Sequence, residues 1–365
     1  MAQDKRLVVD IEKQFGAFHL QIRLAVGTEI CVLFGPSGAG KTQTLNAIAG
    51  LMTPDNGDIT LDGAAFFRRR NAEATVNLPA RQRHVGYVFQ QYALFPHLTA
   101  LENVAYALWR RRDARQRASE LLERMHLEGL ADRYPAELSG GQQQRVAIAR
   151  ALAAESKVLL LDEPFSALDR AIRERLHQDL LALQTEAQLV VLYVTHNLED
   201  AFAIGAKLAI VYDGKVEQIA APEQIIRHPA NANVVKTLGI ANLFEAQITG
   251  VTATGVQLDW QGIKLEAATS QGYEVGATVT AYIRPEELQV IAEIPHSEDT
   301  TYNYLSGTIT RRQAGYQFHT LRVRLANAQE IEVAVPASQS LATLADDTIR
   351  LALAKTALRL LPPVI

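Results

Sequence analysis

Residues 35–42 carry the side chains in this sequence that are best suited to binding phosphate groups. They read Gly-Pro-Ser-Gly-Ala-Gly-Lys-Thr and follow the apolar run Ile30–Phe34, which predicts a buried strand. Glycines in such a loop let successive backbone N–H groups turn toward phosphate oxygens. Lys41 would supply a positive charge for the β- and γ-phosphates, and Thr42 would offer a hydroxyl to Mg²⁺. We therefore predict a nucleotide site, with the N-terminus of a helix over residues 42–50 facing the anion.

Two later apolar runs end in side chains that suit hydrolysis. Val158–Leu161 precedes Asp162 and Glu163, which is the pattern of a buried parallel strand with functional groups at its carboxyl end. Asp162 suits Mg²⁺ bound through water, and Glu163 would orient or deprotonate an attacking water. An unpaired buried carboxylate is costly, which favours a functional role for both acids. His196 follows the similar run Leu189–Thr195 and is either a structural histidine or a side chain that senses the γ-phosphate.

Two weaker signals lie between these strands. Gln90 follows the expected strand His84–Phe89 and is either a surface amide or a partner for a Mg²⁺-bound water. Ser139 is a good N-cap for a helix that continues over Gln143–Leu152. The two glycines after Ser139 would leave the first N–H groups of that helix open to an anion. The sequence thus predicts a second phosphate-type site.

Length and composition indicate a globular chain of two or three domains. The chain has 365 residues, of which 48% are hydrophobic and 21% charged, so it has ample material for a core. A net charge of -4 and a pI near 6.2 give no overall attraction to nucleic acid. We interpret the two arginine runs, Arg68–Arg70 and Arg110–Arg112, as solvated faces.

Cys31 is the only cysteine, so no intrachain disulfide can form and a reducing compartment is expected. The polar start, residues 1–6, does not resemble a signal peptide, and no stretch approaches the ~20 apolar residues of a membrane-spanning helix. We expect a protein that is soluble by itself and reaches a membrane through a partner.

Periodicity places the remaining elements of the first part of the chain. Leu7–Val26 alternates apolar and polar residues and predicts antiparallel strands. Phe15 and Phe18 lie there; an aromatic in such a strand is more often part of the core, but either could stack on adenine, and we choose Phe15. Residues 64–83 look polar and irregular, whereas residues 98–134 have helical spacing and predict a small helical subdomain.

Beyond residue 241 the pattern changes to short alternating strands with turn signals. Two similar units are visible, opened by Asn242–Ile248 and Asn303–Ile309 and closed by Val279–Pro285 and Ile349–Lys355. We interpret them as a tandem repeat of small OB-type β-barrels.

The order of the motifs resembles the ATPase subunit of ABC transporters, over roughly residues 5–235. The parts that carry the resemblance are GPSGAGKT at 35–42, Gln90, LSGGQ at 138–142, LLLDEP at 159–164, SALD at 166–169 and His196. It implies an α/β P-loop NTPase domain, with a RecA-like core, an antiparallel β subdomain and a helical subdomain, followed by an all-β OB-like C-terminal domain. The expected boundaries are 1–235 for the ATPase domain, about 92–150 for its helical subdomain, and 236–365 for the tail, with units at about 241–292 and 301–362.

The resemblance also implies roles for individual residues, with ATP and Mg²⁺ as cofactors. Glu163 would be the catalytic base, His196 the switch and Gln90 a contact to water. The metal contacts would come from Thr42, Gln90 and Asp162. The expected ATP contacts are Phe15, Gly35, Pro36, Ser37, Gly38, Ala39, Gly40, Lys41, Thr42, Gln43, Ser139, Gly140, Gly141, Gln142 and Asp169. Gln43 departs from the family, which usually has Ser or Thr there to touch the α-phosphate.

The partners that the resemblance implies form a transport complex. Two copies of the chain would make a head-to-tail homodimer, in which Ser139, Gly141 and Gln142 of one subunit close over ATP held by the other. Two transmembrane permease subunits would dock near Gln90–Leu98, and a periplasmic or extracellular solute-binding protein would act indirectly. We expect a peripheral protein on the cytoplasmic face of the bacterial inner (plasma) membrane, without a nucleic-acid partner.

The sequence is compatible with several transported solutes. The second tail unit looks like the oxyanion-binding module of the molybdate system, because it keeps Asn303, Leu305 and Gly307, although it lacks the arginine of that motif. We therefore expect an importer ATPase for molybdate or a related oxyanion, with sulfate, ferric iron, polyamine or sugar as alternatives. The tail is either an oxyanion-binding regulatory domain or a dimerisation module. A soluble ABC ATPase acting on nucleic acid or ribosomes, and an anion-responsive regulator, are the hypotheses from other classes.

Overall fold

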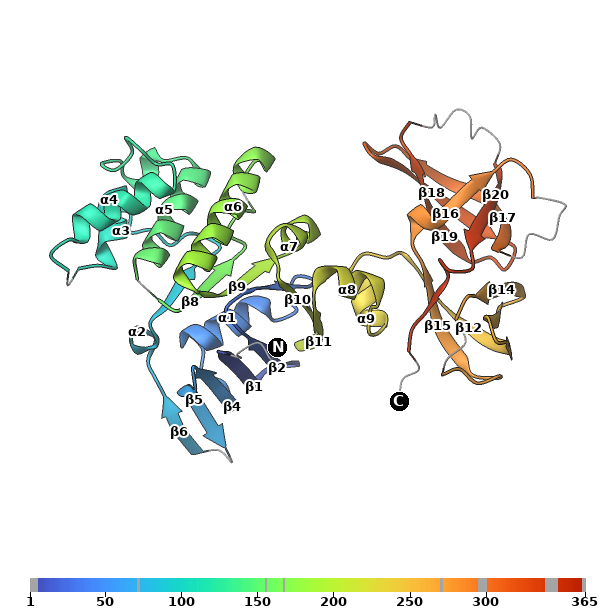
Figure 1. Ribbon diagram of the computed structural model, residues 1–365, viewed down its shortest axis with the longest axis horizontal. Coiled ribbons are helices and arrows are strands. Elements are labelled where there is room, and N and C mark those ends of the chain that lie inside the picture. Colours follow the sequence, from blue (N-terminus) through green and yellow to red (C-terminus); the bar gives the residue numbers. More distant parts are fainter. Residues whose placement is uncertain are drawn as a thin grey trace. The chain divides into compact units, whose positions relative to one another are not determined.

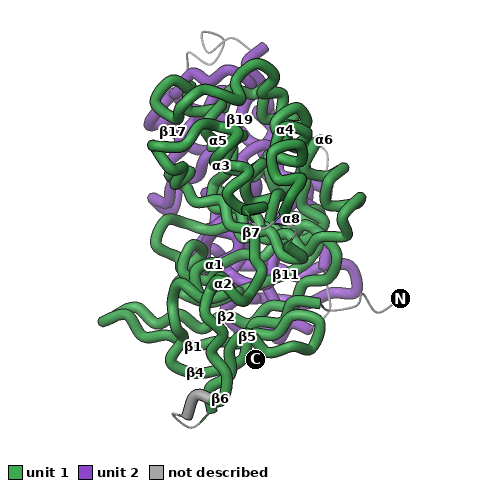
Figure 2. The backbone as a smooth tube through the Cα atoms, turned by 90° about the vertical axis from the view of Figure 1, so that its left-hand side faces the viewer, with its two compact units in different colours: residues 1–228 green, residues 229–365 purple. Residues whose placement is uncertain are grey.

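The computed structural model describes residues 6–70, 73–109, 111–154, 156–166, 168–269, 272–294, 301–338 and 347–362. The chain forms two compact units, residues 1–228 and 229–365 (Figure 2). Ala167 of the motif at 166–169 and Arg110 of the second arginine run lie outside the described residues. Over the ranges given above, no helix is both long enough and apolar enough to cross a membrane.

One eleven-stranded sheet runs through the first unit in the order β6-β5-β4-β1-β2-β11-β10-β3-β9-β8-β7 (Figure 1). Its strands are β1 (Leu7–Phe15), β2 (Phe18–Val26), β3 (Ile30–Phe34), β4 (Asn56–Leu61), β5 (Ala64–Arg70), β6 (Glu73–Asn77), β7 (Val85–Val88), β8 (Val158–Asp162), β9 (Val190–Thr195), β10 (Lys207–Tyr212) and β11 (Lys215–Ala220). The strands from β10 to β7 are parallel, and those from β6 to β2 are antiparallel. The predicted α/β domain with an antiparallel β part is confirmed.

The register of the parallel strands brings their carboxyl ends to one edge of the sheet. Phe34 lies opposite Thr195, Asp162 opposite Val194, and Val88 opposite Leu161. Every residue of β3, β8 and β9 is buried, as expected for strands covered on both faces. The loops that leave these strands are therefore neighbours in space, which is where ligands bind in such sheets.

The helices of this unit are α1 (Lys41–Ala49), α2 (Ala80–Arg83), α3 (Ala100–Tyr106), α4 (Ala114–Arg124), the 3₁₀ turn η1 (Pro135–Glu137), α5 (Gly140–Ala153), α6 (Arg170–Ala187), α7 (Leu198–Ile204) and α8 (Pro222–Arg227). Figure 1 shows α3, α4 and α5 grouped at one end of the unit, and the strands β4 to β6 at the other. The grouped helices lie between β7 and β8 in the chain, where the helical subdomain was expected.

Residues 64–83 are not irregular, so that prediction is wrong. They form β5, β6 and α2. Phe67 of β5 is fully buried in the core, and the Arg83 side chain donates hydrogen bonds to the carbonyls of Ala47 and Ile48 at 2.6 and 2.9 Å. Arg83 thereby donates to two carbonyls in the last turn of α1, where carbonyls lack the regular hydrogen bonds of the helix interior. The polar composition of the segment concealed these long-range contacts.

The second unit begins with α9 (Ala232–Thr237) and contains two five-stranded antiparallel sheets, β14-β13-β12-β15-β21 and β16-β20-β17-β18-β19. The strands are β12 (Asn242–Val251), β13 (Val256–Trp260), β14 (Ile263–Ala267), β15 (Thr278–Ile283), β16 (Leu288–Ile291), β17 (Tyr302–Gln313), β18 (Phe318–Leu325), β19 (Glu330–Pro336), β20 (Thr348–Ala354) and β21 (Arg359–Leu360); the 3₁₀ turn η2 (Pro285–Glu287) precedes β16. The predicted all-β region is confirmed, and α9 belongs to it because Val235 is buried with Tyr282 and Leu361.

The two repeats exchange their last strands. β16 comes from the first repeat but pairs with β20 of the second, whereas β21 comes from the second and pairs with β15 of the first. The apolar side chains of both sheets share one core, which includes Trp260 and Leu351. The repeats are thus parts of one folding unit, and neither forms a complete sheet from its own strands.

Candidate functional site

The glycine-rich loop joins β3 to α1 at the carboxyl edge of the sheet. Gly38 and Gly40 have φ values of 82° and 101°, a region that residues with a Cβ rarely adopt. A Cβ on Gly40 would also collide with the side chain of Leu20. Leu45 and Ile48 are fully buried and hold α1 against the core, so the N-terminus of α1 opens on the same edge.

Lys41 is buried inside this loop. Its Nζ atom donates hydrogen bonds to the carbonyl oxygens of Gly35 and Pro36, at 2.7 and 2.8 Å. Burial lowers the pKa of the Lys41 amine, while the nearby carboxylates of Glu163 and Asp162 raise it. The ammonium group is therefore bound to backbone carbonyls of the loop and lies near two carboxylates, those of Asp162 at the end of β8 and of Glu163 directly after it.

Thr42 and Asp162 meet across the edge. The Thr42 hydroxyl donates a hydrogen bond to Oδ1 of Asp162 at 3.2 Å. Burial raises the pKa of the Asp162 carboxyl, the hydrogen bond from Thr42 lowers it, and the nearby charge of Glu163 raises it again. A hydroxyl beside a carboxylate supplies the oxygen ligands that Mg²⁺ prefers. In the ranges that the structure describes, no three His, Cys, Asp or Glu side chains gather as a metal site.

Glu163 lies where three chain segments converge. Its Oε1 is 3.2 Å from Nδ1 of His196, and its Oε2 accepts a hydrogen bond from Nε2 of Gln90 at 3.5 Å. Its backbone N–H donates to the carbonyl of Val194 at 3.0 Å. Its φ of 49° lies in the left-handed region, a strain that clusters at functional sites in non-glycine residues. The structure thus brings Glu163, His196 and Gln90 together.

A cavity of about 460 Å³ occupies this edge. Its lining includes Phe15, Phe18, Ser37, Gly38, Gly40, Lys41, Thr42, Gln43, Gln90, Glu163 and Val194. Phe18 was not among the predicted contacts, although it lies in the same alternating segment as Phe15. The centroids of the two rings are 6.4 Å apart. Nothing in the sequence indicated that Val194 lines the cavity, because an apolar residue in a buried strand cannot be told from other core residues.

The other predicted nucleotide contacts lie away from the cavity lining. Gly35 and Ala39 are buried under the loop, and Pro36 is exposed. Ser139 caps α5 as predicted: its Oγ accepts from the N–H of Gln142 at 3.3 Å, and Oε1 of Gln142 accepts from the N–H of Ser139 at 2.8 Å. Asp169 caps α6 through the N–H of Ile172. Ser139, Gly140, Gly141, Gln142 and Asp169 do not line the cavity of their own chain.

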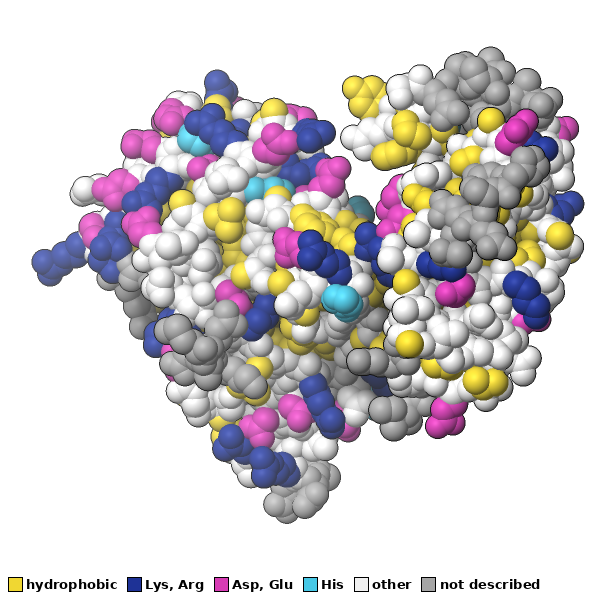
Figure 3. Space-filling model, turned by 45° about the vertical axis from the view of Figure 1, so that its right-hand side comes forward, with side chains coloured by type: hydrophobic (Ala, Val, Ile, Leu, Met, Phe, Trp, Pro, Cys, Tyr) yellow, Lys and Arg dark blue, Asp and Glu magenta, His cyan; other side chains and the backbone are white. Residues whose placement is uncertain are grey.

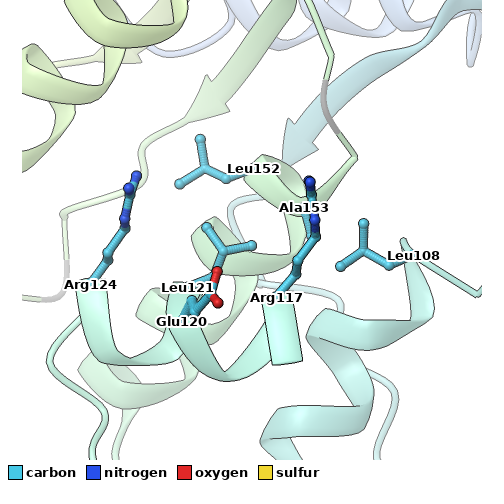
Figure 4. Close-up of a pocket in the computed structure, with 7 residues that line it drawn as sticks. All are labelled: Leu108, Arg117, Glu120, Leu121, Arg124, Leu152 and Ala153. Carbon is cyan, nitrogen blue, oxygen red and sulfur yellow. The ribbon is translucent and has the colours of Figure 1, made fainter. Parts of the chain in front are cut away.

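A second cavity, of about 310 Å³, lies in the helical subdomain (Figure 4). Arg117, Glu120, Leu121 and Arg124 of α4 face Leu152 and Ala153 at the end of α5, with Leu108 alongside. It contains none of the predicted site residues. On the visible face of each unit, basic and acidic side chains are interspersed, and no extended basic surface stands out (Figure 3).

Comparison with known proteins shows the same similarity from sequence and from structure. Residues 20–166 match the family model described as "ABC transporter". A sulfate/thiosulfate import ATP-binding protein of Chromobacterium violaceum is 43% identical over 299 residues, which is 78% of each chain. A spermidine/putrescine import ATP-binding protein of Methylococcus capsulatus is 37% identical over 313 residues, 83% of this chain and 77% of the relative. The post-hydrolysis dimer of an ATP-binding cassette bound to ADP and Pi matches with a TM-score of 0.52 and 34% identity, over 59% of this chain and 98% of that one.

Proposed function

The chain belongs to the ABC transporter family, as the ATP-hydrolysing subunit of an importer, and from this membership we propose that ATP is hydrolysed at the edge where β3, β8 and β9 end. Two contacts beside one cavity carry the proposal. The Thr42 hydroxyl lies 3.2 Å from Oδ1 of Asp162, and Oε1 of Glu163 lies 3.2 Å from Nδ1 of His196. The phosphate loop lies there beside Asp162 at the end of β8 and Glu163 directly after it, as phosphoryl transfer requires.

Each side chain has a distinct part in the proposed reaction. The N–H groups of residues 38–42 and the Lys41 ammonium bind the phosphates. Thr42 and Asp162 would hold Mg²⁺, with Gln90 beside them, and the ion would neutralise phosphate charge. Glu163 accepts a proton from the attacking water, and His196 contacts the γ-phosphate while its Nδ1 stays next to Glu163.

A second copy of the chain completes the site in this proposal. Ser139 and its helix N-terminus do not line the cavity of their own chain, which is why they need another subunit to reach ATP. The similar cassette of known structure is a dimer. In this arrangement Ser139, Gly141 and Gln142 of one subunit would close over the phosphates held by the other.

We place the permease contact on the segment Gln90–Leu98 and the start of the helical subdomain. This segment begins two residues after β7 and leads to α3, and Arg150 of α5 donates hydrogen bonds to the carbonyls of Tyr92 and Ala93. A movement of the helical subdomain would therefore pull on the segment that positions Gln90. The chain would then act at the cytoplasmic face of the membrane through two permease subunits, and a solute-binding protein would contribute indirectly.

For the solute we favour a sulfate-type oxyanion, with a polyamine as the second candidate, because the relatives named above import one or the other. Molybdate, the narrower expectation, has less support. Asn303 is part of the motif that suggested it, but both polar atoms of the Asn303 side chain are bonded to the backbone of Glu266.

Substitution of Glu163 by Gln tests the hydrolytic site. We expect the variant to bind MgATP and to lose hydrolysis by at least about 100-fold, because an amide cannot accept the proton of water. Steady-state phosphate release and nucleotide retention on a desalting column measure the two properties. Hydrolysis at the wild-type rate would contradict the role given to Glu163.

The solute is tested by uptake of radiolabelled sulfate and of labelled putrescine in a bacterium whose own importer ATPase for that solute has been deleted. We expect this chain, expressed with its permease partners, to restore sulfate uptake, and the Glu163→Gln variant to fail. If the chain restored uptake of putrescine but not of sulfate, the result would contradict the sulfate proposal and favour a polyamine as the solute.

A further inference from the structure

A buried polar cluster lies behind the loop that carries His196, and the proposed reaction does not use it. It consists of Tyr193 and Thr195 of β9, Asp200 of α7 and His177 of α6. The exposed fraction of Asp200 is 4% and that of His177 is 3%. Burial of a charged group costs free energy unless hydrogen-bonding partners are provided. We therefore asked what function this cluster serves.

Asp200 fixes the chain on both sides of His196. Its Oδ2 accepts hydrogen bonds from the Thr195 hydroxyl at 2.9 Å and from the Tyr193 hydroxyl at 3.3 Å. The Thr195 oxygen in turn accepts a hydrogen bond from the N–H of Asn197 at 3.0 Å. Thr195 and Asn197 are the two neighbours of His196, so one carboxylate holds the turn from which the histidine projects.

His196 needs such support, because its own side chain has little. That side chain is 65% exposed, and its contact with the protein at the site is the one between Nδ1 and Oε1 of Glu163. The direction of the imidazole is therefore set mainly by the backbone of its turn. A displacement of about 1 Å in a reacting group can lower a rate by about 100-fold.

The other oxygen of Asp200 faces α6. Oδ1 of Asp200 lies 3.5 Å from Nε2 of His177. Helix α6 begins directly after the segment that contains Glu163 and Asp169, and Arg173 in its first turns donates a hydrogen bond to the carbonyl of Leu168 at 2.9 Å. Asp200 thus lies between the turn of His196 and the helix that follows Glu163.

A role as the cap of α7 does not account for Asp200. Asn197 already caps this helix, since its Oδ1 accepts from the N–H of Glu199 at 2.8 Å. The oxygens of Asp200 are directed at β9 and α6 instead.

We infer that Asp200 is a positioning residue for hydrolysis: it orients His196 toward Glu163 through Thr195. The inference rests on the proposed roles of Glu163 and His196. Asp200 is not among the residues that line the nucleotide cavity, but it lines a smaller cavity of about 70 Å³ together with Glu163 and His196.

The first experiment compares kcat and KM for MgATP in the purified full chain carrying Asp200→Asn, Thr195→Val or Thr195→Ser. We expect Asp200→Asn and Thr195→Val to lower kcat by about 10-fold or more, with KM changed by less than about twofold, since the phosphate contacts remain. Thr195→Ser keeps the hydroxyl and should stay within about twofold of the wild type.

Asp179 of α6, the helix that carries His177, offers a control. Its Oδ2 lies 3.4 Å from Nε2 of His126, a residue outside β9. Asp179→Asn therefore tests the general effect of breaking a His–Asp pair on α6. We expect its kcat to stay within about twofold of the wild type.

A second experiment asks whether Asp200 acts through His196. In a His196→Ala background, Asp200→Asn should lower kcat by less than about twofold, because the group that it positions is gone. A purely structural role would give the same loss in both backgrounds.

The outcomes separate the inference from the function on which it rests. Wild-type kcat in Asp200→Asn, equal losses in both backgrounds, or a KM that rises as kcat falls would overturn the inference, while Glu163→Gln and His196→Ala still hydrolyse ATP measurably but more slowly than the wild type. If Glu163→Gln and His196→Ala themselves hydrolyse ATP normally, the proposed function fails first.

Discussion

The buried thiol of Cys31, in the strand before the phosphate loop, should make the stability of the fold depend on pH. This thiol is fully buried in β3, and burial raises its pKa to about 12, assisted by the charge of Glu29. In the unfolded chain the thiol ionises near pH 8.5. Above that pH the unfolded state loses a proton that the folded state keeps, so the free energy of unfolding should fall by about 1.4 kcal/mol per pH unit.

Urea unfolding, followed by circular dichroism at pH 7.5, 8.5 and 9.5, measures this dependence. Cys31→Ala is the control, because it removes the thiol and leaves every other titrating group. We expect the wild type to lose more stability than the variant between pH 8.5 and 9.5, and parallel curves would contradict the account.

Phe15 and Phe18 offer the nucleotide cavity two aromatic rings, of which we assign Phe15 to adenine. Phe15→Ala should raise KM for ATP at least about fivefold with little change in kcat, since stacking of a base on an aromatic ring contributes about 1–3 kcal/mol. Phe18→Ala is the matched comparison because its ring lines the same cavity. A larger rise in KM for Phe18→Ala would reassign the adenine contact.

At the scale of elements, the tail is held together by two equivalent asparagines. The Asn242 side chain accepts from the N–H of Glu332 at 2.6 Å and donates to its carbonyl at 2.7 Å. The Asn303 side chain makes the same pair of bonds to Glu266, at 2.7 and 2.9 Å. Each asparagine opens one repeat and clamps the third strand of the other repeat, so these bonds reinforce the strand exchange.

Replacement of either asparagine by Ala should therefore destabilise the whole tail. Each substitution leaves a backbone N–H and a carbonyl without partners, and we expect a loss of about 2–4 kcal/mol from both variants. The chain has two tryptophans, so a Trp109→Phe background leaves buried Trp260 as the fluorescent reporter of the tail during urea unfolding.

Gln289→Ala, an exposed position on β16, serves as the control and should change stability by less than about 0.5 kcal/mol. Unchanged stability of Asn303→Ala, together with lost binding of molybdate or sulfate in isothermal titration, would instead identify Asn303 as a ligand residue.

At the scale of the whole molecule, the proposed dimer can be tested by cross-linking. Ser37 of the phosphate loop and Ser139 are both exposed and do not line a common cavity within one chain. Cys31 is buried, so the chain provides an almost unreactive background for introduced cysteines. With Ser37→Cys, Ser139→Cys and Glu163→Gln combined, MgATP should produce a disulfide-linked dimer on a non-reducing gel.

The chain with Ser37→Cys and Glu163→Gln, without the second cysteine, is the control and should remain a monomer on that gel. If the chain that carries both introduced cysteines formed only monomer in the presence of MgATP, the result would argue against the head-to-tail arrangement.

Local patterns were sufficient where a feature depends on neighbours in sequence. The phosphate loop, the buried strands β8 and β9, the N-cap at Ser139 and the alternating strands of the tail were all predicted, because periodicity and turn chemistry are local. Residues 64–83 were missed because Phe67 and Arg83 are ordered by distant partners, namely the core and the end of α1. No local pattern contains those contacts.

The sequence by itself determined the family, the set of candidate nucleotide contacts and the change to an all-β tail, because each depends on residue types at fixed spacings. Only the tertiary structure decided which candidates meet. The parallel register brings Asp162 and Glu163 to Thr42 and His196, while Ser139 and Asp169 cap helices away from that cavity. The exchange of β16 and β21 and the cluster around Asp200 were likewise invisible in the sequence, since pairing between distant strands and burial of a charge depend on the packing of the whole unit.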